Sequence, residues 1–188
     1  MSEQTASDDR AKEREAWHAE QEAKIQVFQY KNRFTKPEDF GHGKATVKLG
    51  RSDILRGFVQ VVRKGGETNL HYHTKIDSLW MVLKGRARFY GPGDVVMGEF
   101  GPHEGVLIPR GARYWFESAG ADDLELLQVS AFSEVGAEKS GRTDASPRKR
   151  PRAATPHYQV RKQWLGQALR RAKSFVAGKR GRLGRSEK

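Results

Sequence analysis

Short runs of β-prone residues, separated by glycine and proline, fill the middle of the chain from about residue 45 to residue 133. No helix-length periodic segment interrupts them. Evenly spaced short strands with turn signals predict a sandwich or a closed barrel rather than a parallel α/β sheet. The runs cover residues 45–49, 58–63, 68–73, 78–83, 86–90, 105–108, 112–117 and 124–132. The turns between them contain Gly65, Gly85, Gly93 and Gly111, at which we expect positive φ angles.

The N-terminal flank has a different pattern. Residues 10–26 alternate charged residues with alanines, and their Glu-to-Lys spacing is typical of a solvated helix. The polar residues 1–9 predict no element. Val27, Phe28 and Tyr30 predict a short strand that ends before Lys36-Pro37.

The C-terminal flank is basic. Residues 139–154 are rich in Ser, Arg, Pro and Lys, which predicts a flexible linker. Thr155-Pro156 is a helix-start signal, and apolar residues recur at helical spacing from Val160 to Val176. We therefore expect a basic amphipathic helix. The predicted organisation is a helical segment (1–26), a β-barrel (27–135), a disordered basic linker (136–154) and a basic helix with a frayed tail (155–188).

Composition adds four expectations. Residues 139–188 contain 16 of the 35 Lys and Arg residues and only two acids, so the basic character belongs to the tail. The absence of cysteine excludes disulfides, thiolate nucleophiles and cysteine zinc sites. No apolar run approaches the roughly 18 residues of a membrane span. The N-terminus lacks the apolar region of a secretion signal, so we expect a cytoplasmic protein.

His71 and His73 are the principal candidates for chemistry. Side chains alternate across a strand, so residues i and i+2 share a face, and both imidazoles can point into the barrel while Tyr72 faces away. Two imidazoles on one wall suit Fe, Mn, Ni, Cu or Zn. Ligands from neighbouring strands would complete such a site.

The run from Gly66 through His71-Tyr72-His73 to Gly85 resembles the first motif of the cupin superfamily, and Pro109-Arg110-Gly111 is similar to part of the second. This resemblance covers about 90 residues. It implies an all-β fold, a single jelly-roll barrel of the RmlC-like type, here with an N-terminal helix and a basic, partly helical or disordered tail. It also implies a divalent metal such as Fe, Mn, Ni or Zn.

The chain departs from the family pattern at two metal positions. The acid lies at Asp77, one residue before the expected position, Ser78, and such an offset turns a side chain to the other face. Tyr114 stands where the family has a histidine. Despite these departures, the ligand set that the resemblance implies at these positions is His71, His73, Asp77 and Tyr114. His103 could enter from a neighbouring strand.

The same residues permit metal-free chemistry. Some metal-free cupins act on nucleotide sugars with a histidine base, a carboxylate and a tyrosine acid. Here His71 or His73 could abstract a proton next to a carbonyl, and Tyr114 could return one. We expect Trp80, Arg86, Arg88 and Tyr90 to line such a pocket.

Three functions follow as alternatives. The first is a small-molecule cupin, a metal-dependent oxidoreductase or an isomerase, that binds a metal or a small sugar, carbonyl or carboxylate ligand through His71 and His73. The second is a metal-free epimerase or isomerase with His71, His73 and Tyr114 as catalytic residues. The third is a non-enzymatic ligand-sensing module. The resemblance implies a homodimer, and the tail suits an anionic membrane surface, an acidic protein or nucleic acid.

Overall fold

A computed structural model describes residues 3–32, 43–148, 157–159 and 163–164. The chain divides into two compact units. One comprises Met1–Gln29 with Arg161–Lys188, and the other comprises Tyr30–Val160.

Helix α1 (Glu3–Ala23) dominates the first unit. The predicted helix is present, but it begins at Glu3 and so includes residues that we expected to form no element. Lys24 and Glu20, four residues apart, form an ion pair of 2.7 Å, the type of contact that stabilises solvated helices. No described helix is both long enough and apolar enough to cross a membrane. Strand β1 (Gln26–Val27) pairs antiparallel with β13 (Gln163–Trp164).

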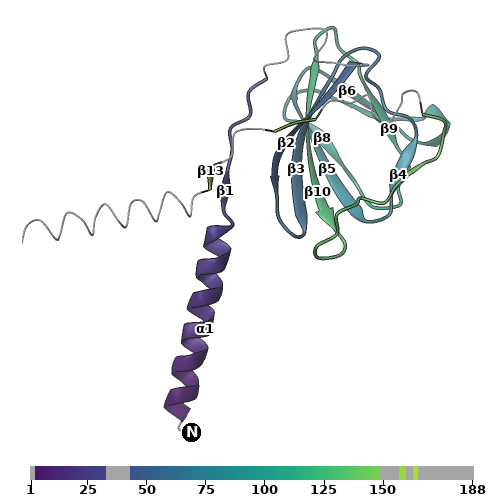
Figure 1. Cartoon of the computed structure of the whole chain (residues 1–188). Helices are drawn as coiled ribbons and strands as arrows, with labels where there is room; N and C mark the ends of the chain where they lie inside the picture. Colours follow the sequence, from purple (N-terminus) through teal and green to yellow (C-terminus); the bar gives the residue numbers. More distant parts are fainter. Residues whose placement is uncertain (1–2, 33–42, 149–156, 160–162, 165–188) are drawn as a thin grey trace, which may run out of the picture. The chain divides into compact units, whose positions relative to one another are not determined.

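The second unit is a β-barrel (Figure 1). Every β-prone run of the sequence overlaps a strand, whereas β7, β11 and β12 were not predicted. The strands are β2 (Lys44–Arg51), β3 (Leu55–Val62), β4 (His71–His73), β5 (Ile76–Lys84), β6 (Ala87–Tyr90), β7 (Val96–Phe100), β8 (Gly105–Ile108), β9 (Trp115–Ser118), β10 (Leu124–Phe132), β11 (Arg142–Asp144) and β12 (His157–Gln159).

Two sheets face each other across the barrel. The first has the order β12-β2-β3-β10-β5-β8, and the second contains β7-β6-β9. Strand β4 continues the second sheet, because His71 and Tyr114, the residue before β9, exchange backbone hydrogen bonds of 3.1 and 2.9 Å. The eight central strands thus form the sets β3-β10-β5-β8 and β4-β9-β6-β7. This pairing is a jelly roll, as the sequence predicted.

Alternation along the strands decides which side chains face inward. In β5, Ile76, Ser78, Trp80 and Val82 are buried. One end of the interior is packed with large apolar side chains from both sheets, among them Phe89. A second apolar cluster of β2 and β3 lies on the opposite face of these strands.

The turns use glycine as predicted, since Gly65, Gly85, Gly93 and Gly111 all have positive φ. At Gly85, glycine is required both by the backbone conformation and by the lack of room for a side chain. Its φ is +81°, and an added Cβ would lie 2.9 Å from the carbonyl oxygen of Asp123. The close approach lets the β5–β6 turn pack against the start of β10.

The C-terminal flank differs from the prediction at the three strands that the structure describes there. Arg142–Asp144 forms β11, paired antiparallel with β4, so this part of the expected linker is ordered structure. Backbone pairing with β4 overrides the linker-like composition of this segment. His157–Gln159 pairs parallel with β2, and Gln163–Trp164 pairs with β1, where we expected helix. The rest of the predicted basic helix lies outside the described residues.

Candidate functional site

The two predicted histidines and the predicted tyrosine meet on the inner wall of the barrel. His71 and His73 lie on β4, and Tyr114 is the backbone partner of His71 in the antiparallel register. Because directly paired residues point to the same face, the His71 and Tyr114 rings lie together, with centroids 4.5 Å apart. The centroids of His71 and His73 are 5.2 Å apart.

These three residues line a cavity of about 260 Å³. The volume is slightly below the ~300–1,000 Å³ typical of small-molecule pockets. Both sheets and β11 contribute to the wall. The lining residues are Lys44, Thr46, Arg56, Phe58, Gln60, Thr68, His71, His73, Trp80, Tyr114, Phe116, Gln128 and Arg142.

His71 is held as a neutral imidazole of defined tautomer. Its Nδ1 lies 2.7 Å from the carbonyl oxygen of Asn69, and because a carbonyl can only accept, Nδ1 donates. The Nε2 atom then carries the free lone pair. Burial, reinforced by the nearby Arg142 guanidinium, lowers the pKa of His71 to about 3.

His73 is also neutral near pH 7. Burial and the Arg142 and Arg56 guanidinium groups lower its pKa to about 4. Its Nδ1 is buried and has no hydrogen-bond partner of good geometry among the described residues. His73 can therefore either donate to or accept from a bound molecule.

Tyr114 is almost completely buried, and burial raises the pKa of its hydroxyl. The hydroxyl is protonated at any physiological pH. It has no partner of good hydrogen-bond geometry in the described part of the chain, and neither has the indole Nε1 of Trp80. The Trp80 side chain also interacts with the Tyr114 hydroxyl, which acts against the effect of burial on the pKa of Tyr114. The Tyr114 hydroxyl can donate its proton to a bound molecule.

The charged residues of the cavity are all basic. Lys44, Arg56 and Arg142 line it, and no aspartate or glutamate is among its described lining residues. Burial lowers the pKa of Arg56 and of Arg142, which reflects the cost of removing these cations from water. The cavity therefore has a positive potential.

One side of the cavity is a buried amide and hydroxyl network. Gln60 donates from Nε2 to Gln128 Oε1 at 2.8 Å, and Gln128 donates to the Ser130 hydroxyl at 3.1 Å. The hydroxyl oxygens of Ser78 and Ser130 are 3.0 Å apart and form a hydrogen bond. The network fixes the two glutamines and leaves Gln60 Oε1 without a partner among the described residues.

Some predicted residues lie elsewhere. Asp77 faces outward from β5, accepts a 2.8 Å hydrogen bond from the Arg110 backbone and pairs with its guanidinium. The expectation that Asp77 joins the site is therefore wrong: it follows buried Ile76 and precedes buried Ser78, so strand alternation turns it away. His103 is exposed in the turn before β8.

The other expected lining residues divide in the same way. Trp80 lines the cavity, whereas Arg86, Arg88 and Tyr90 do not. Both arginines pair with Glu99 on the outer face, and the Tyr90 hydroxyl donates to Glu117.

Seven polar lining residues were not predicted from the sequence: Lys44, Thr46, Arg56, Gln60, Thr68, Gln128 and Arg142. Arg56, Gln60 and Gln128 lie in strands at positions that alternate with apolar residues, a signal of inward polar groups that could have been read. Arg142 had no such signal, because it lies in a segment whose composition is typical of a linker.

The donor set of the cavity does not fit the metal centre that the resemblance implies. Transition metals take three or four protein ligands from imidazole, thiolate or carboxylate groups. The described residues contain no group of three or more such side chains that could hold a metal ion. A guanidinium beside both imidazoles also opposes a second cation. We assign no chemical step to a metal.

No protein-family model matches the chain, and no curated protein sequence matches it either. Solved structures do. An uncharacterized conserved protein with a double-stranded β-helix domain from Klebsiella pneumoniae is 14% identical, with 64% of this chain and 100% of that chain covered and a TM-score of 0.49.

Two further structures are similar. KdgF from Halomonas sp. is 14% identical, with 57% of this chain and 95% of that chain covered and a TM-score of 0.46. A cupin superfamily protein from Desulfitobacterium hafniense is 16% identical, with 54% and 83% covered and a TM-score of 0.42. Likeness at these identities concerns the fold alone. The strand order β3-β10-β5-β8 facing β4-β9-β6-β7 gives this chain a jelly-roll fold, with His71 and His73 on its inner wall.

Proposed function

We propose that the barrel binds a small organic anion, a carboxylate or a phosphate ester, without a metal ion. One observation carries this proposal. Among the described residues, five buried polar atoms that make no hydrogen bond of good geometry belong to side chains lining the same cavity, and the charged side chains of this described lining are all basic. The five atoms are Arg56 Nε, Gln60 Oε1, His73 Nδ1, Trp80 Nε1 and Tyr114 Oη.

Electrostatics favour a negative ligand. An unpartnered buried polar group costs about 1–3 kcal/mol, and an uncompensated buried charge costs more. The Arg56 and Arg142 guanidinium groups both lower the pKa of His73, so both cations act on the space around this ring. An acidic group bound there would compensate them.

The remaining unpartnered atoms indicate what else the ligand carries. Trp80 Nε1 can only donate, the Tyr114 hydroxyl can do either, and Gln60 Oε1 can only accept. A ligand with a hydroxyl group beside its acidic group would satisfy both kinds, because a hydroxyl both donates and accepts. Hydroxy acids and small sugar acids or sugar phosphates have this combination.

Metal-free proton transfer is a second candidate. The free Nε2 lone pair of His71 and the protonated Tyr114 hydroxyl flank the cavity, as an epimerase or isomerase would require. A histidine with a pKa of about 3 is a weak base at neutral pH, however, so binding is favoured over catalysis. Exchange of ligand C–H protons with deuterated water, catalysed by the full chain and abolished by His71→Asn, would establish the second function.

Calorimetry on the full chain, dialysed against a chelator, tests the proposal. The probes are glycerate, malonate and inorganic phosphate, with glycerol as the neutral counterpart of glycerate. We expect at least one anion to bind and glycerol not to bind. Because a hydrogen bond to a charged group contributes about 1.5–3 kcal/mol, Arg56→Gln should weaken binding about tenfold or more.

Arg88→Gln is the matched control. It removes the same charge from the outer face, where Arg88 pairs with Glu99, and should leave affinity nearly unchanged. Equal losses in both variants, equal binding of glycerol and glycerate, or no binding of any anion would each contradict the proposal. Binding that requires added divalent metal would restore the metal-dependent alternative.

A further inference from the structure

Strand β11 is weakly anchored by backbone pairing. It pairs through three residues with β4 and with no other described strand. Its side chains are half-buried or exposed, so apolar burial contributes little to its position. Segments of this kind, with few buried contacts, open at low free-energy cost.

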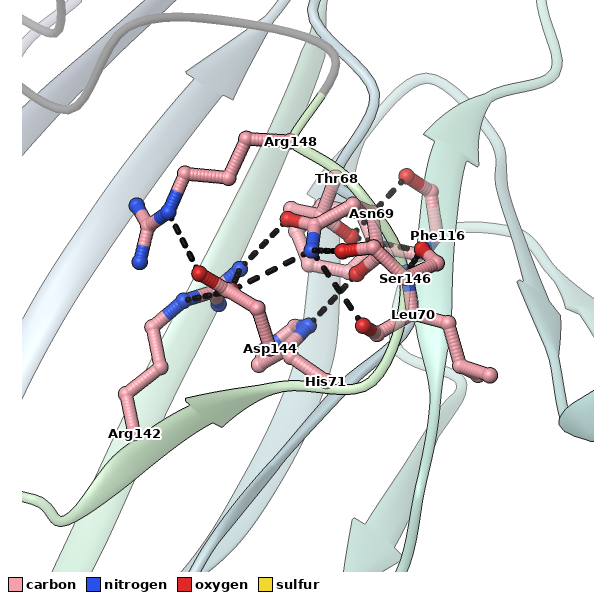
Figure 2. Close-up of polar contacts among 9 residues, drawn as sticks. All are labelled: Thr68, Asn69, Leu70, His71, Phe116, Arg142, Asp144, Ser146 and Arg148. Carbon is pink, nitrogen blue, oxygen red and sulfur yellow. Dashed lines mark hydrogen bonds and ion pairs between the residues drawn. The ribbon is translucent and has the colours of Figure 1, made fainter.

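Asn69 organises the polar contacts that hold the segment, as Figure 2 shows. This side chain is only 6% exposed. Its Nδ2 donates to Asp144 Oδ1 at 3.2 Å and to the Ser146 carbonyl at 3.0 Å, and its Oδ1 accepts from Arg142 at 2.7 Å. The backbone N–H groups of Ala145 and Ser146 donate to the Leu70 carbonyl.

The charges of this network do not balance. Asp144 is shared between Arg142 and Arg148, so one carboxylate faces two guanidinium groups (Figure 2). The neighbouring imidazoles are neutral and contribute no negative charge. Arg142 is also the member of the network that lines the cavity. Within the described residues, its hydrogen bonds use Nε and Nη2 and leave Nη1 without one.

We infer that Gly141–Ser146 is an anion-locked strap: an acidic group of the ligand that binds Arg142 holds this segment, with β11, against β4. The inference rests on the proposed function and adds a regulation to it. The docked strap supplies a cation that the ligand needs, and the ligand supplies the negative charge that the docked strap lacks. Opening of the strap would remove Arg142 from the cavity wall and release the ligand.

Thermodynamic linkage between ligand binding and docking of the strap determines how strongly the ligand stabilises the docked strap. If the ligand binds only when the strap is docked, it shifts the strap equilibrium by a factor of 1 + [L]/Kd. At a hundred times Kd, the amides of the strap should exchange with deuterium about a hundredfold more slowly. Amides in the centre of β10, which exchange through larger openings, serve as the internal reference.

Hydrogen–deuterium exchange on the full chain tests the inference, with malonate, glycerate and inorganic phosphate as probes and calorimetry on the same samples. Arg142→Gln should weaken anion binding about tenfold or more and abolish the ligand-dependent protection of residues 142–146. Arg148→Gln is the matched control, because it removes an equal charge from Asp144 without altering the cavity lining. It should keep the ligand-dependent protection.

Gly141→Ala disturbs the strap without changing a charge. Gly141 has φ +64°, and an added Cβ would lie 2.1 Å from Thr74 Oγ1. We expect faster exchange of the strap and weaker anion binding. Anion binding with unchanged exchange of residues 142–146, or equal behaviour of the Arg142 and Arg148 variants, would overturn the strap and leave the proposed function standing. No binding of any anion would overturn the proposed function itself, and the strap with it.

Discussion

The two buried histidines should make the barrel acid-labile in a defined pH range. Well above pH 6.5, the usual pKa of histidine, both imidazoles are neutral in the folded and in the unfolded chain, so they add no pH dependence. Below pH 6.5 the unfolded chain takes up protons that the folded barrel excludes, because burial lowers the pKa of His71 to about 3 and of His73 to about 4. Stability therefore falls as the pH falls through this range.

The magnitude follows from the two pKa values. Each proton taken up only by the unfolded chain lowers the free energy of unfolding by about 1.4 kcal/mol per pH unit. Between pH 6 and pH 5, where the imidazole of the unfolded chain is mostly but not fully protonated, each histidine should contribute about 1 kcal/mol. Two histidines then lower a total stability of about 5–15 kcal/mol by roughly 2 kcal/mol.

Urea unfolding at pH 7, 6 and 5, followed by tryptophan fluorescence and far-ultraviolet circular dichroism, measures the slope of the free energy of unfolding against pH. His71→Asn preserves a donor toward the Asn69 carbonyl and cannot be protonated, and His73→Gln removes the other imidazole. In each variant, the part of this slope that comes from the two histidines should fall to about half, whatever the stability of the variant at pH 7. His18→Gln, on the exposed surface of α1, is the control. Slopes parallel to the parent protein in both variants would refute the assignment of buried neutral imidazoles.

Three further changes test other parts of the structure. Ser130→Ala removes the completely buried hydroxyl that accepts from Gln128, and urea unfolding should show that the free energy of unfolding falls by about 1–3 kcal/mol. A loss below about 0.5 kcal/mol would contradict this buried hydrogen bond. Gly105→Ala places a Cβ 1.8 Å from the carbonyl oxygen of Trp80. Thermal unfolding should therefore show a far larger loss of stability than for Gly65→Ala, where the space is open and only the φ of +80° opposes the change. Asp77→Asn breaks an outward ion pair with a carboxylate side chain 38% exposed, so the free energy of unfolding should fall by less than about 1 kcal/mol, and calorimetry should show unchanged anion affinity.

The fold and part of the site could be predicted because they depend on local periodicity. Evenly spaced β-prone runs between turn glycines determine a closed all-β domain, and the i, i+2 spacing of His71 and His73 places both on one face of a strand. The same rule explains why Asp77 was misplaced. It lies one residue from Ser78, and a one-residue offset selects the opposite face.

The chemistry of the cavity depended on contacts between residues distant in sequence, which periodicity does not encode. Arg56 and Arg142 act on His73 only because β3 and β11 both contribute to the wall of the cavity, and this proximity, together with burial, sets the charge of the site. The pairing of β11 with β4 was beyond prediction, because a polar, linker-like segment acquires its structure from the strand edge and the buried Asn69 that receive it. The sequence by itself determined the barrel and its pair of inward imidazoles, whereas only the tertiary structure decided that their neighbours are cations and unpartnered polar atoms rather than metal-binding carboxylates.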